Sequence, residues 1–396
     1  MSPSAHAFDT GGLDACPFMP VFGPPQLMFV KGRGTELWDS NGKRYLDFLG
    51  GLAVIGLGHA NPVVAAAIAE QAGELLHVSN LFANPVATRA AVEVDRLLAE
   101  ATGDAGQVFF TNSGAEAIEC ALKLARKHGG RNRHVVVSAL GSFHGRTLAA
   151  LAATGQPTKH EPFQPMPEGF HHVAWGDVGA MAKAVDASVA AVLIEPVQGE
   201  GGVNMAPDGY LRAIREICDD TGALMMIDEI QTGFGRTGRW FAFEHDGVRP
   251  DVVTLAKAMG NGMPVGACWA RREIAAVFEP GDHGSTYSGT AIATAAVNAV
   301  IDEMRRLGAP ALAADQGAKL AAGLAALPGV TAVRGRGLLL AAELEAGGAP
   351  AVQRRLLDAG LVTNAVTPTA LRLAPPLTVS DEEIVEAVGL IAAALS

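Results

Sequence analysis

The sequence predicts an α/β protein with a large, mainly parallel sheet and a second, smaller α+β domain. Between Gln107 and Ala270, short apolar runs bounded by Gly, Pro and polar residues alternate with helical patterns, which is typical of a parallel sheet covered by helices. Beyond Trp269 the pattern changes to a long alanine-rich helix, then short strands and further helices. A length of 396 residues is in keeping with two domains.

The composition is that of an ordinary globular chain. Hydrophobic residues make up 49% of the sequence and charged residues 18%, which argues against a disordered chain. The formal net charge of −11 argues against nucleic acid as a partner, because such a partner favours a basic face. No apolar run is long enough to span a membrane. The first Lys or Arg is Lys31, so we expect no signal peptide.

The four cysteines are Cys16, Cys120, Cys218 and Cys268, and they are widely scattered. They form no Cys-x-x-Cys pair and no Cys/His spacing of the kind that binds a metal. We therefore expect a cytoplasmic protein without a metal site, whose cysteines are mostly buried as small hydrophobic side chains.

The first hundred residues predict an arm, a hairpin and two helices. Residues 1–30 are rich in Gly and Pro and weakly patterned, as expected for an arm laid on another surface such as a partner subunit. The stretch 35–48 predicts a hairpin with Asn41–Gly42 as its turn. Helices are predicted at Pro62–His77 and Pro85–Ala101, each opened by a proline.

A strand, a tight loop and a helix are predicted between Gln107 and His128. Ser113, Gly114 and Ala115 fall at the N-terminus of this helix. Free N–H groups and the helix dipole make such a position a site for an anion, for example a cofactor phosphate. The same residues fit an ordinary helix start in which Ser113 caps its own helix, so both interpretations are open.

A second strand, at 134–138, precedes the loop Gly141–Thr147. In this loop Phe143 and Arg146 can stack on a ring and hold a carboxylate. They can equally be a core aromatic residue and a surface arginine. The pattern of strand and polar loop, followed by an amphipathic helix, recurs at 190–196, 198–202 and 210–221.

The stretch Ala223–Lys257 carries the clearest chemistry. Two apolar runs, predicted as buried strands, stop at Asp228 and Lys257, and the carboxyl edge of such a sheet is where ligands bind. A lysine amine forms a Schiff base with the aldehyde of pyridoxal phosphate. A carboxylate keeps the pyridine nitrogen protonated, so that the ring accepts electrons from a substrate carbanion. Alone, a strand-end lysine can equally be solvated or salt-bridged.

The C-terminal third predicts a loop, helices and short strands. The loop is His283–Gly289, and Ser380-Asp-Glu-Glu383 forms a capping box that opens the last helix. Helices are predicted at 291–306, 310–326 and 350–360, and strands at 338–344 and 371–373.

A series of motifs, taken in order, resembles the class III, fold-type I pyridoxal phosphate aminotransferases. The resemblance runs from Pro20 to the C-terminus. One such motif is weak evidence, but the ordered set is specific. The motifs are Asn112-Ser-Gly-Ala-Glu-Ala117, Phe143-His-Gly-Arg146, Glu195-Pro-Val-Gln-Gly-Glu-Gly-Gly202, Asp228-Glu-Ile-Gln231, Gly235-Arg-Thr-Gly238, Leu255-Ala-Lys257, His283-Gly-Ser-Thr286 and Leu371-Arg-Leu-Ala-Pro-Pro376.

The resemblance implies the fold-type I architecture and a homodimer with shared active sites. Residues 1–60 would form the N-terminal arm and part of the small domain. Residues 61–290 would form the large domain that binds pyridoxal phosphate. Residues 291–396 would form the C-terminal small domain, with an interdomain helix.

The resemblance also implies how the cofactor is held. Lys257 is the expected Schiff-base lysine, and Asp228 is the expected partner of the pyridine nitrogen. Gln231 would lie near the ring oxygen, and Phe143 would stack on the ring. The phosphate would be bound by Ser113, Gly114 and Ala115 of the same chain. Thr286 of the partner subunit would also bind it.

For the substrates, the resemblance implies that the terminal amine of N2-acetylornithine passes to 2-oxoglutarate, as in arginine biosynthesis. Arg372 would hold the α-carboxylate of glutamate, and Arg146 the carboxylate far from the reacting carbon. Glu200 would pair with Arg372 while the terminal amine is bound, because an unpaired buried arginine beside an apolar substrate is costly. Ser285 and Phe22 complete the expected substrate pocket.

The sequence departs from the family pattern at three places, and the first two remove polar groups near the distal end of this pocket. Phe22 stands where a tyrosine is usual, and Ile55 where asparagine is frequent. The loop after Tyr287 reads Ser288-Gly-Thr-Ala291 instead of Gly-Gly-Asn-Pro, whereas Asn364 matches enzymes that use acetylornithine. These departures leave ornithine, succinyl-diaminopimelate and 4-aminobutyrate open as alternative donors.

Two other classes of function compete with an aminotransferase. The first is an intramolecular aminomutase, against which the loop 198–202 and Arg372 favour a transaminase with two substrates. The second is a catalytically inactive relative, against which the retention of Lys257, Asp228 and both arginines argues.

Overall fold

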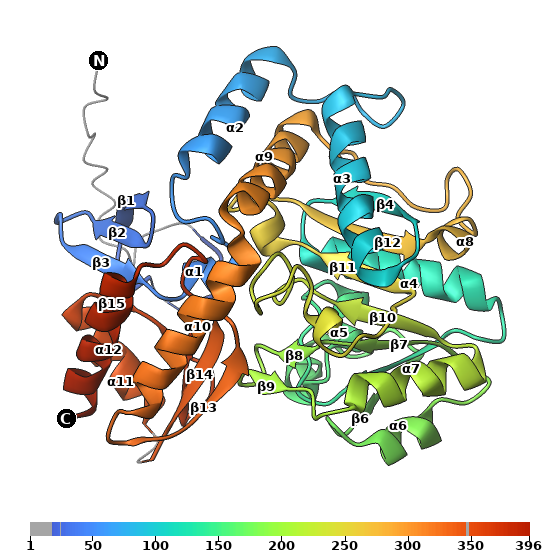
Figure 1. Cartoon of the computed structure of the whole chain (residues 1–396). Coiled ribbons are helices and arrows are strands. Elements are labelled where there is room, and N and C mark those ends of the chain that lie inside the picture. The colour runs from blue at the N-terminus through green and yellow to red at the C-terminus, as the bar shows by residue number, and fades with distance from the viewer. Residues whose placement is uncertain (1–17, 24, 346–347) are drawn as a thin grey trace.

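A seven-stranded sheet is the largest layer of the computed structural model, which describes residues 18–23, 25–345 and 348–396 (Figure 1). Its strands are β4 (Gly106–Thr111), β5 (Val135–Ala139), β6 (Phe170–Val173), β7 (Val189–Ile194), β10 (Leu224–Asp228), β11 (Val252–Leu255) and β12 (Gly266–Arg271). They are ordered β4-β12-β11-β10-β7-β5-β6, and β12 alone runs antiparallel to its neighbours. The predicted α/β fold with a mainly parallel sheet is confirmed.

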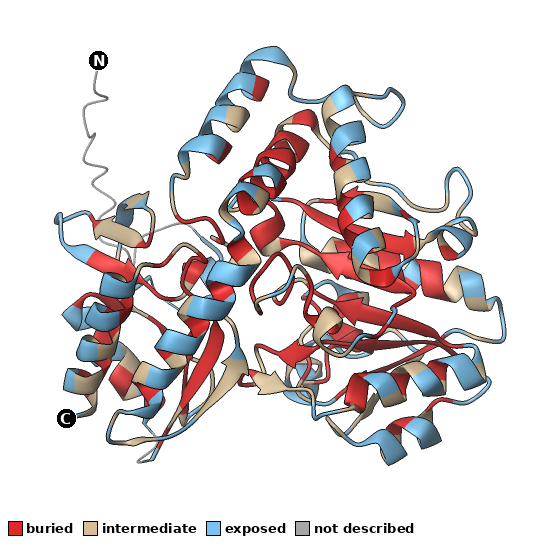
Figure 2. Ribbon diagram, in the orientation of Figure 1, coloured by how far each residue is buried: buried red, intermediate tan, exposed pale blue. Residues whose placement is uncertain are grey.

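Strands β5, β7, β10 and β11 of this sheet are buried on both faces, since their side chains alternate between two apolar layers, whereas no residue of the edge strand β6 is buried (Figure 2). Ile227 of β10 belongs to one cluster with Ile214 of α7 (Tyr210–Thr221). Met226, the preceding residue, belongs to the other cluster with Ile118 of α4 (Gly114–Gly129). Continuous apolar runs are what a sheet covered by helices on both faces requires.

The predicted helices begin where the sequence places them. Helices α2 (Pro62–Glu74) and α3 (Pro85–Thr102) both start at a proline, and the side chains of Asn61 and Asn84 cap them. Helix α2 ends before the predicted His77, because Leu75 is already extended. The other α-helices before residue 290 are α1 (Gly50–Ala53), α5 (Leu148–Ala153), α6 (Val178–Ala184) and α8 (Arg272–Ala275).

The C-terminal part combines helices with an antiparallel sheet ordered β13-β14-β17-β16. The predicted capping box is present, because Ser380 Oγ accepts from the Glu383 amide and Glu383 Oε2 accepts from the Ser380 amide, at 3.2 and 2.8 Å. The elements are α9 (Ala291–Leu307), α10 (Ala309–Ala325), β13 (Val330–Arg336), β14 (Leu339–Leu344), α11 (Ala349–Ala359), β16 (Asn364–Ala365), β17 (Ala370–Leu373) and α12 (Asp381–Leu395).

The N-terminal hairpin is attached to this C-terminal part. A four-stranded sheet joins the two ends of the chain, in the order β1 (Phe29–Arg33), β2 (Glu36–Asp39), β3 (Arg44–Asp47) and β15 (Leu361–Val362). The last strand, β15, pairs with β3. The predicted hairpin with its Asn41–Gly42 turn is confirmed. Most of the predicted arm falls on residues 1–17 and 24, outside the described residues. The domain boundaries at residues 60 and 290 stay a prediction.

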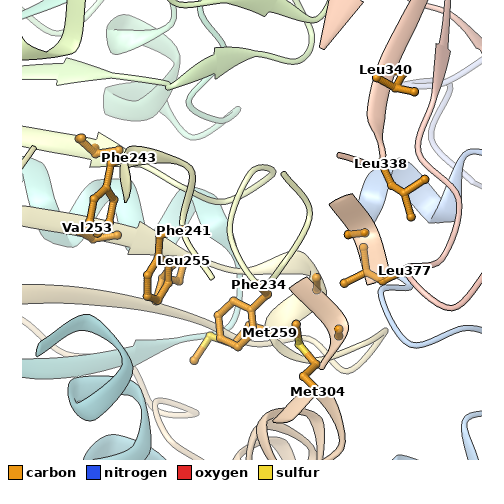
Figure 3. Packing of buried hydrophobic residues seen from close by; sticks show 14 of the residues in the cluster. Phe234, Phe241, Phe243, Val253, Leu255, Met259, Met304, Leu338, Leu340 and Leu377 are labelled. Carbon is orange, nitrogen blue, oxygen red and sulfur yellow. The ribbon is translucent and has the colours of Figure 1, made fainter. Parts of the chain in front are cut away.

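One apolar cluster connects the large sheet with the C-terminal part, as Figure 3 shows for its labelled side chains. It runs from Val253, Leu255, Phe241 and Phe243 through Phe234, Met259 and Met304 to Leu377, Leu338 and Leu340. In the described part of the chain, no helix is both long and apolar enough to cross a membrane. Cys120, Cys218 and Cys268 are buried free thiols, as predicted, and Cys16 lies outside the described residues.

Candidate active site

A cavity of about 410 Å³ lies at the ends of β10 and β11 and the loops that follow β4, β5 and β7. Segments far apart in the sequence meet here, because parallel strands deliver their carboxyl ends to the same edge of the sheet. The cavity is lined by many of the predicted site residues, namely Ser113, Gly114, Ala115, Phe143, Arg146, Glu200, Asp228, Gln231 and Lys257.

The N-terminus of α4 forms one wall of this cavity. The Ser113 hydroxyl accepts from the Glu116 amide at 3.3 Å, so Ser113 does cap its own helix. The amides of Gly114 and Ala115 have no partner inside the helix and remain available to an anion. A side chain at residue 114 would collide with Ile230, whose Cδ1 would lie 2.8 Å from the added Cβ. The two interpretations of this segment are therefore compatible.

Asp228 lies at the end of β10, and both of its carboxylate oxygens have partners. Oδ2 lies 2.8 Å from Nδ1 of His144, and Oδ1 accepts from the Ile230 amide at 3.0 Å. Both side chains are buried, with 4% of Asp228 and none of His144 exposed. His144 belongs to a motif singled out in the sequence, but its contact with Asp228 was not predicted, because nothing in the sequence pairs these two segments.

Lys257 stands at the cavity with an unusual backbone conformation. Strand β11 ends at Leu255, two residues before the predicted end, and Lys257 opens the short helix η5 (Lys257–Met259) with φ of 49°. A non-glycine residue in this region is strained, and such strain concentrates at functional sites. Burial lowers the pKa of the Lys257 amine and the Arg372 guanidinium lowers it further, although Glu200 and Asp228 act in the opposite direction.

Glu200 and Arg372 form an ion pair at the cavity. Arg372 is 1% exposed, and its other terminal nitrogen donates to Asn364 Oδ1 at 3.0 Å. The Gln231 amide donates to Glu200 Oε1 at 3.4 Å. Burial raises the pKa of Glu200, but the nearby Arg372 outweighs this effect and the pKa lies below its usual value. Glu200 is therefore an anion held against a buried cation.

Glu195 lines the cavity, although no role was predicted for it from the sequence. Its carboxyl accepts from the Phe143 amide at 3.1 Å, so it fixes the backbone beneath the aromatic ring. Burial raises the pKa of Glu195 well above the ordinary value, and the charge of Asp228 adds to this effect. Glu195 is therefore a buried carboxyl whose ionised form is disfavoured by its surroundings.

Four predicted residues do not line the cavity of their own chain. One is Arg372, which meets the cavity through its partner Glu200, and the others are Phe22, Thr286 and Ser285. Phe22 is 88% exposed, and Thr286 is also exposed. Ser285 lies closer, because its hydroxyl accepts from the side chain of Asn112, a lining residue, at 3.1 Å. Ile55 adjoins Gly262 of the cavity wall, since a Cβ on that glycine would lie 3.2 Å from Ile55 Cδ1.

Comparison with known proteins gives a consistent result. The family model for class-III aminotransferases matches residues 20–395. An acetylornithine aminotransferase from Methanopyrus kandleri is 47% identical over 373 residues, which cover 93% of this chain and 94% of that protein.

Two solved structures are similar along nearly the whole chain. One is an ornithine aminotransferase from Toxoplasma gondii with partial occupancy of pyridoxal phosphate at its active site; it has a TM-score of 0.89 and 34% identity, covering 96% of this chain and 92% of that one. The other is N-acetylornithine aminotransferase from Stenotrophomonas maltophilia, with a TM-score of 0.82 and 36% identity, covering 94% and 96%.

Proposed function

Because the chain belongs to the class-III aminotransferase family, we propose that it transfers the terminal amine of N2-acetylornithine to 2-oxoglutarate. The products are N-acetylglutamate semialdehyde and glutamate, as in a step of arginine biosynthesis. Relatives that cover more than nine tenths of the chain carry this activity in their names. The observation that carries the proposal is the ion pair that Glu200, a lining residue of the cavity that also holds Lys257, forms with the buried Arg372.

The cavity residues fit pyridoxal phosphate, the cofactor of class-III aminotransferases. The amides at the start of α4 suit its phosphate, and the Asp228 carboxylate suits a protonated ring nitrogen. Two buried polar atoms, Gln231 Oε1 and His144 Nε2, have no partner among the described residues. Such atoms are costly unless a bound group satisfies them.

Each of these residues has a distinct task. Lys257 would hold the cofactor through its amine and would move the proton at the reacting carbon of the substrate, for which a lowered pKa is suitable. Asp228 would keep the ring nitrogen protonated by its charge, Phe143 would stack on the ring, and Gln231 would serve the ring oxygen. When bound, the cofactor supplies an electron sink for the substrate carbanion.

Two different amine donors must use one pocket. Glutamate has a carboxylate on its reacting carbon, whereas the terminal amine of acetylornithine sits on a plain methylene. With acetylornithine bound, Glu200 neutralises Arg372, so that the buried guanidinium is not left unpaired. With glutamate bound, Glu200 moves aside and Arg372 binds the α-carboxylate in its place.

Arg146 is the residue for the carboxylate at the far end of either substrate. Its guanidinium is exposed at the cavity and takes part in no ion pair with the described residues. A planar guanidinium holds a carboxylate through two parallel hydrogen bonds. Ser285 and Phe22 are proposed to approach the same end of the substrate.

A second copy of the chain would complete the site. Leu81 and Phe82 are 85% and 70% exposed, and Tyr287 is 61% exposed beside Thr286. His77 packs against Tyr287, with ring centroids 5.5 Å apart, which joins the two loops into one surface. In a homodimer this apolar surface is covered, and Thr286 and Phe22 serve the active site of the partner. Three buried free thiols suit a reducing compartment such as the cytoplasm.

The proposal is tested by following the amine itself. Holoenzyme is incubated with 2-oxoglutarate and acetylornithine carrying isotope-labelled nitrogen on its terminal amine, and the products are identified by mass spectrometry. The label should appear in glutamate, and Lys257→Ala should abolish its transfer. Transfer of the label from ornithine, 4-aminobutyrate or succinyl-diaminopimelate, but not from acetylornithine, would contradict the proposal.

A further inference from the structure

Lys159 is held firmly at the edge of the active site. It ends the short helix η2 (Pro157–Lys159), and its ammonium donates to the side-chain oxygen of Gln156. The Gln156 amide in turn donates to the backbone oxygen of Ser142 at 2.9 Å. Lys159 is thereby tied to the loop that carries Phe143 and Arg146, although it lies further along the chain.

Two cations gather on one aromatic ring. The Arg146 Cζ atom lies 5.6 Å from the centroid of Phe143, and the Lys159 ammonium lies 5.8 Å from the same centroid. Within the described ranges, neither cation forms an ion pair with a carboxylate. Because Phe143 and Arg146 line the cavity, this excess positive charge faces the place where a substrate carboxylate binds.

The charge of Lys159 interacts with two residues that line the cavity, Arg146 and Glu200. Burial lowers the pKa of the Lys159 ammonium, the neighbouring Arg146 lowers it further, and Glu200 acts in the opposite direction. Lys159 itself is not one of the lining residues. It therefore acts through space as a charge 5.8 Å from the Phe143 ring centroid, while Arg146 is the residue that can bind a ligand directly.

We infer that Lys159 is a specificity-determining residue that disfavours donors with a free α-ammonium group and favours donors in which this nitrogen is acylated. The inference rests on the proposed function, in which Arg146 holds the α-carboxylate of the donor. The α-nitrogen of the donor is then one bond removed from the carbon that bears this carboxylate. An ammonium there is repelled by Lys159, whereas the amide of acetylornithine is neutral. Repulsion of the wrong partner is a common source of specificity.

The test compares ornithine with 5-aminopentanoate, which differ only in the α-ammonium group. Lys159→Met removes the charge, Lys159→Arg keeps it, and Lys183→Met removes an exposed lysine of α6 as a matched control. In Lys159→Met, the ratio of kcat/KM for ornithine to that for 5-aminopentanoate should rise about 2- to 5-fold. The ratio should stay at the wild-type value in the other two variants. An unchanged ratio in Lys159→Met, or an equal rise in Lys183→Met, would overturn the inference.

Failure of the Lys159 inference can be distinguished from failure of the proposed function. Wild-type activity with acetylornithine tests the proposed function, whereas the ratio concerns the effect of one charge on two simple donors. If Lys159→Met does not fold, Lys159→Gln is measured with the same expectation. If either donor is turned over too slowly, its competition with the best donor gives the ratio of binding constants, and the same rise is expected.

Discussion

His144 Nδ1 lies 2.8 Å from Asp228 Oδ2 in the buried floor of the active site. The contact joins the loop after β5 to the end of β10, two strands that are separated by β7 in the sheet. It fixes the orientation of the carboxylate that is proposed to serve the ring nitrogen of the cofactor. His144 is therefore a positioning residue, which acts on the chemistry through Asp228.

Replacing His144 should lower turnover more than it weakens substrate binding. In His144→Phe the buried carboxylate loses a hydrogen bond to a charged group, which is worth about 1.5–3 kcal/mol. We expect kcat to fall roughly 10- to 150-fold, with little change in KM and an altered pH dependence of the cofactor absorbance. His144→Asn places an N–H near the original Nδ1 position and should recover much of the loss. Equal activity in both variants would show that Asp228 needs no such partner.

The ion pair of Glu200 and Arg372 predicts opposite effects on the two half-reactions. Glu200→Ala should leave glutamate binding unchanged or tighter, because Arg372 is then free, and it should impair the half-reaction of the terminal amine. Arg372→Ala should mainly impair the glutamate half-reaction. Single-turnover measurements of the two halves check both expectations, with losses of roughly 10- to 150-fold for the affected half. Similar damage to both halves in each variant would refute the switch.

The exposed position of Thr286 predicts that two impaired variants complement each other. Lys257→Ala removes the amine from its own site, and Thr286→Ala is proposed to weaken the phosphate site of the partner. After the two are unfolded and refolded together, a mixed dimer has one site with both defects and one intact site. Activity should therefore recover to well above that of either variant alone. No recovery, with mixed dimers demonstrated by a tag on each chain, would mean that Thr286 does not act across subunits.

Glu229, next to Asp228, predicts how stability depends on pH. Its carboxyl is buried, with Thr232 Oγ1 at 2.5 Å and the Phe243 amide at 2.9 Å, and burial raises its pKa from 4.5 to about 7. The native state then binds this proton more tightly than the unfolded chain does. The contribution of this proton to the free energy of unfolding is fully present below the unfolded pKa of 4.5. It is lost as the pH rises through about 7.

Glu229→Gln should remove that pH dependence. Denaturant unfolding of the holoenzyme at about pH 5 and about pH 8 should show a smaller loss of unfolding free energy in the variant, by at most about 1.4 kcal/mol for each unit of pKa shift. Glu216→Gln, on the exposed side of α7, is the matched control and should follow the wild type. A wild-type slope in Glu229→Gln would contradict the assignment.

The sequence was sufficient for the elements that carry their own signals. Prolines and asparagines mark the starts of α2 and α3, and the capping box marks α12. Strand β13 was missed because it is mostly half-buried or exposed, so its apolar alternation is weak. Strand β15 was missed because two residues are too few to show a pattern.

The site shows the same division between local and long-range information. Ser113, Asp228 and Lys257 stand beside the ends of predicted strands, so the sheet edge itself brings them together. The contacts of His144 with Asp228 and of Glu195 with the Phe143 amide join distant segments, and they depend on how neighbouring strands are ordered. No local pattern encodes that order.

The central claim is that the donor is a terminal amine whose α-nitrogen is acylated. Arg146 provides for the α-carboxylate, whereas the free ammonium of ornithine would be desolvated beside Ile55 and Phe22 without compensation. The most direct test is kcat/KM of the wild-type holoenzyme for acetylornithine, ornithine and 4-aminobutyrate, each with saturating 2-oxoglutarate. We expect the highest value for acetylornithine. A higher value for ornithine or for 4-aminobutyrate would contradict it.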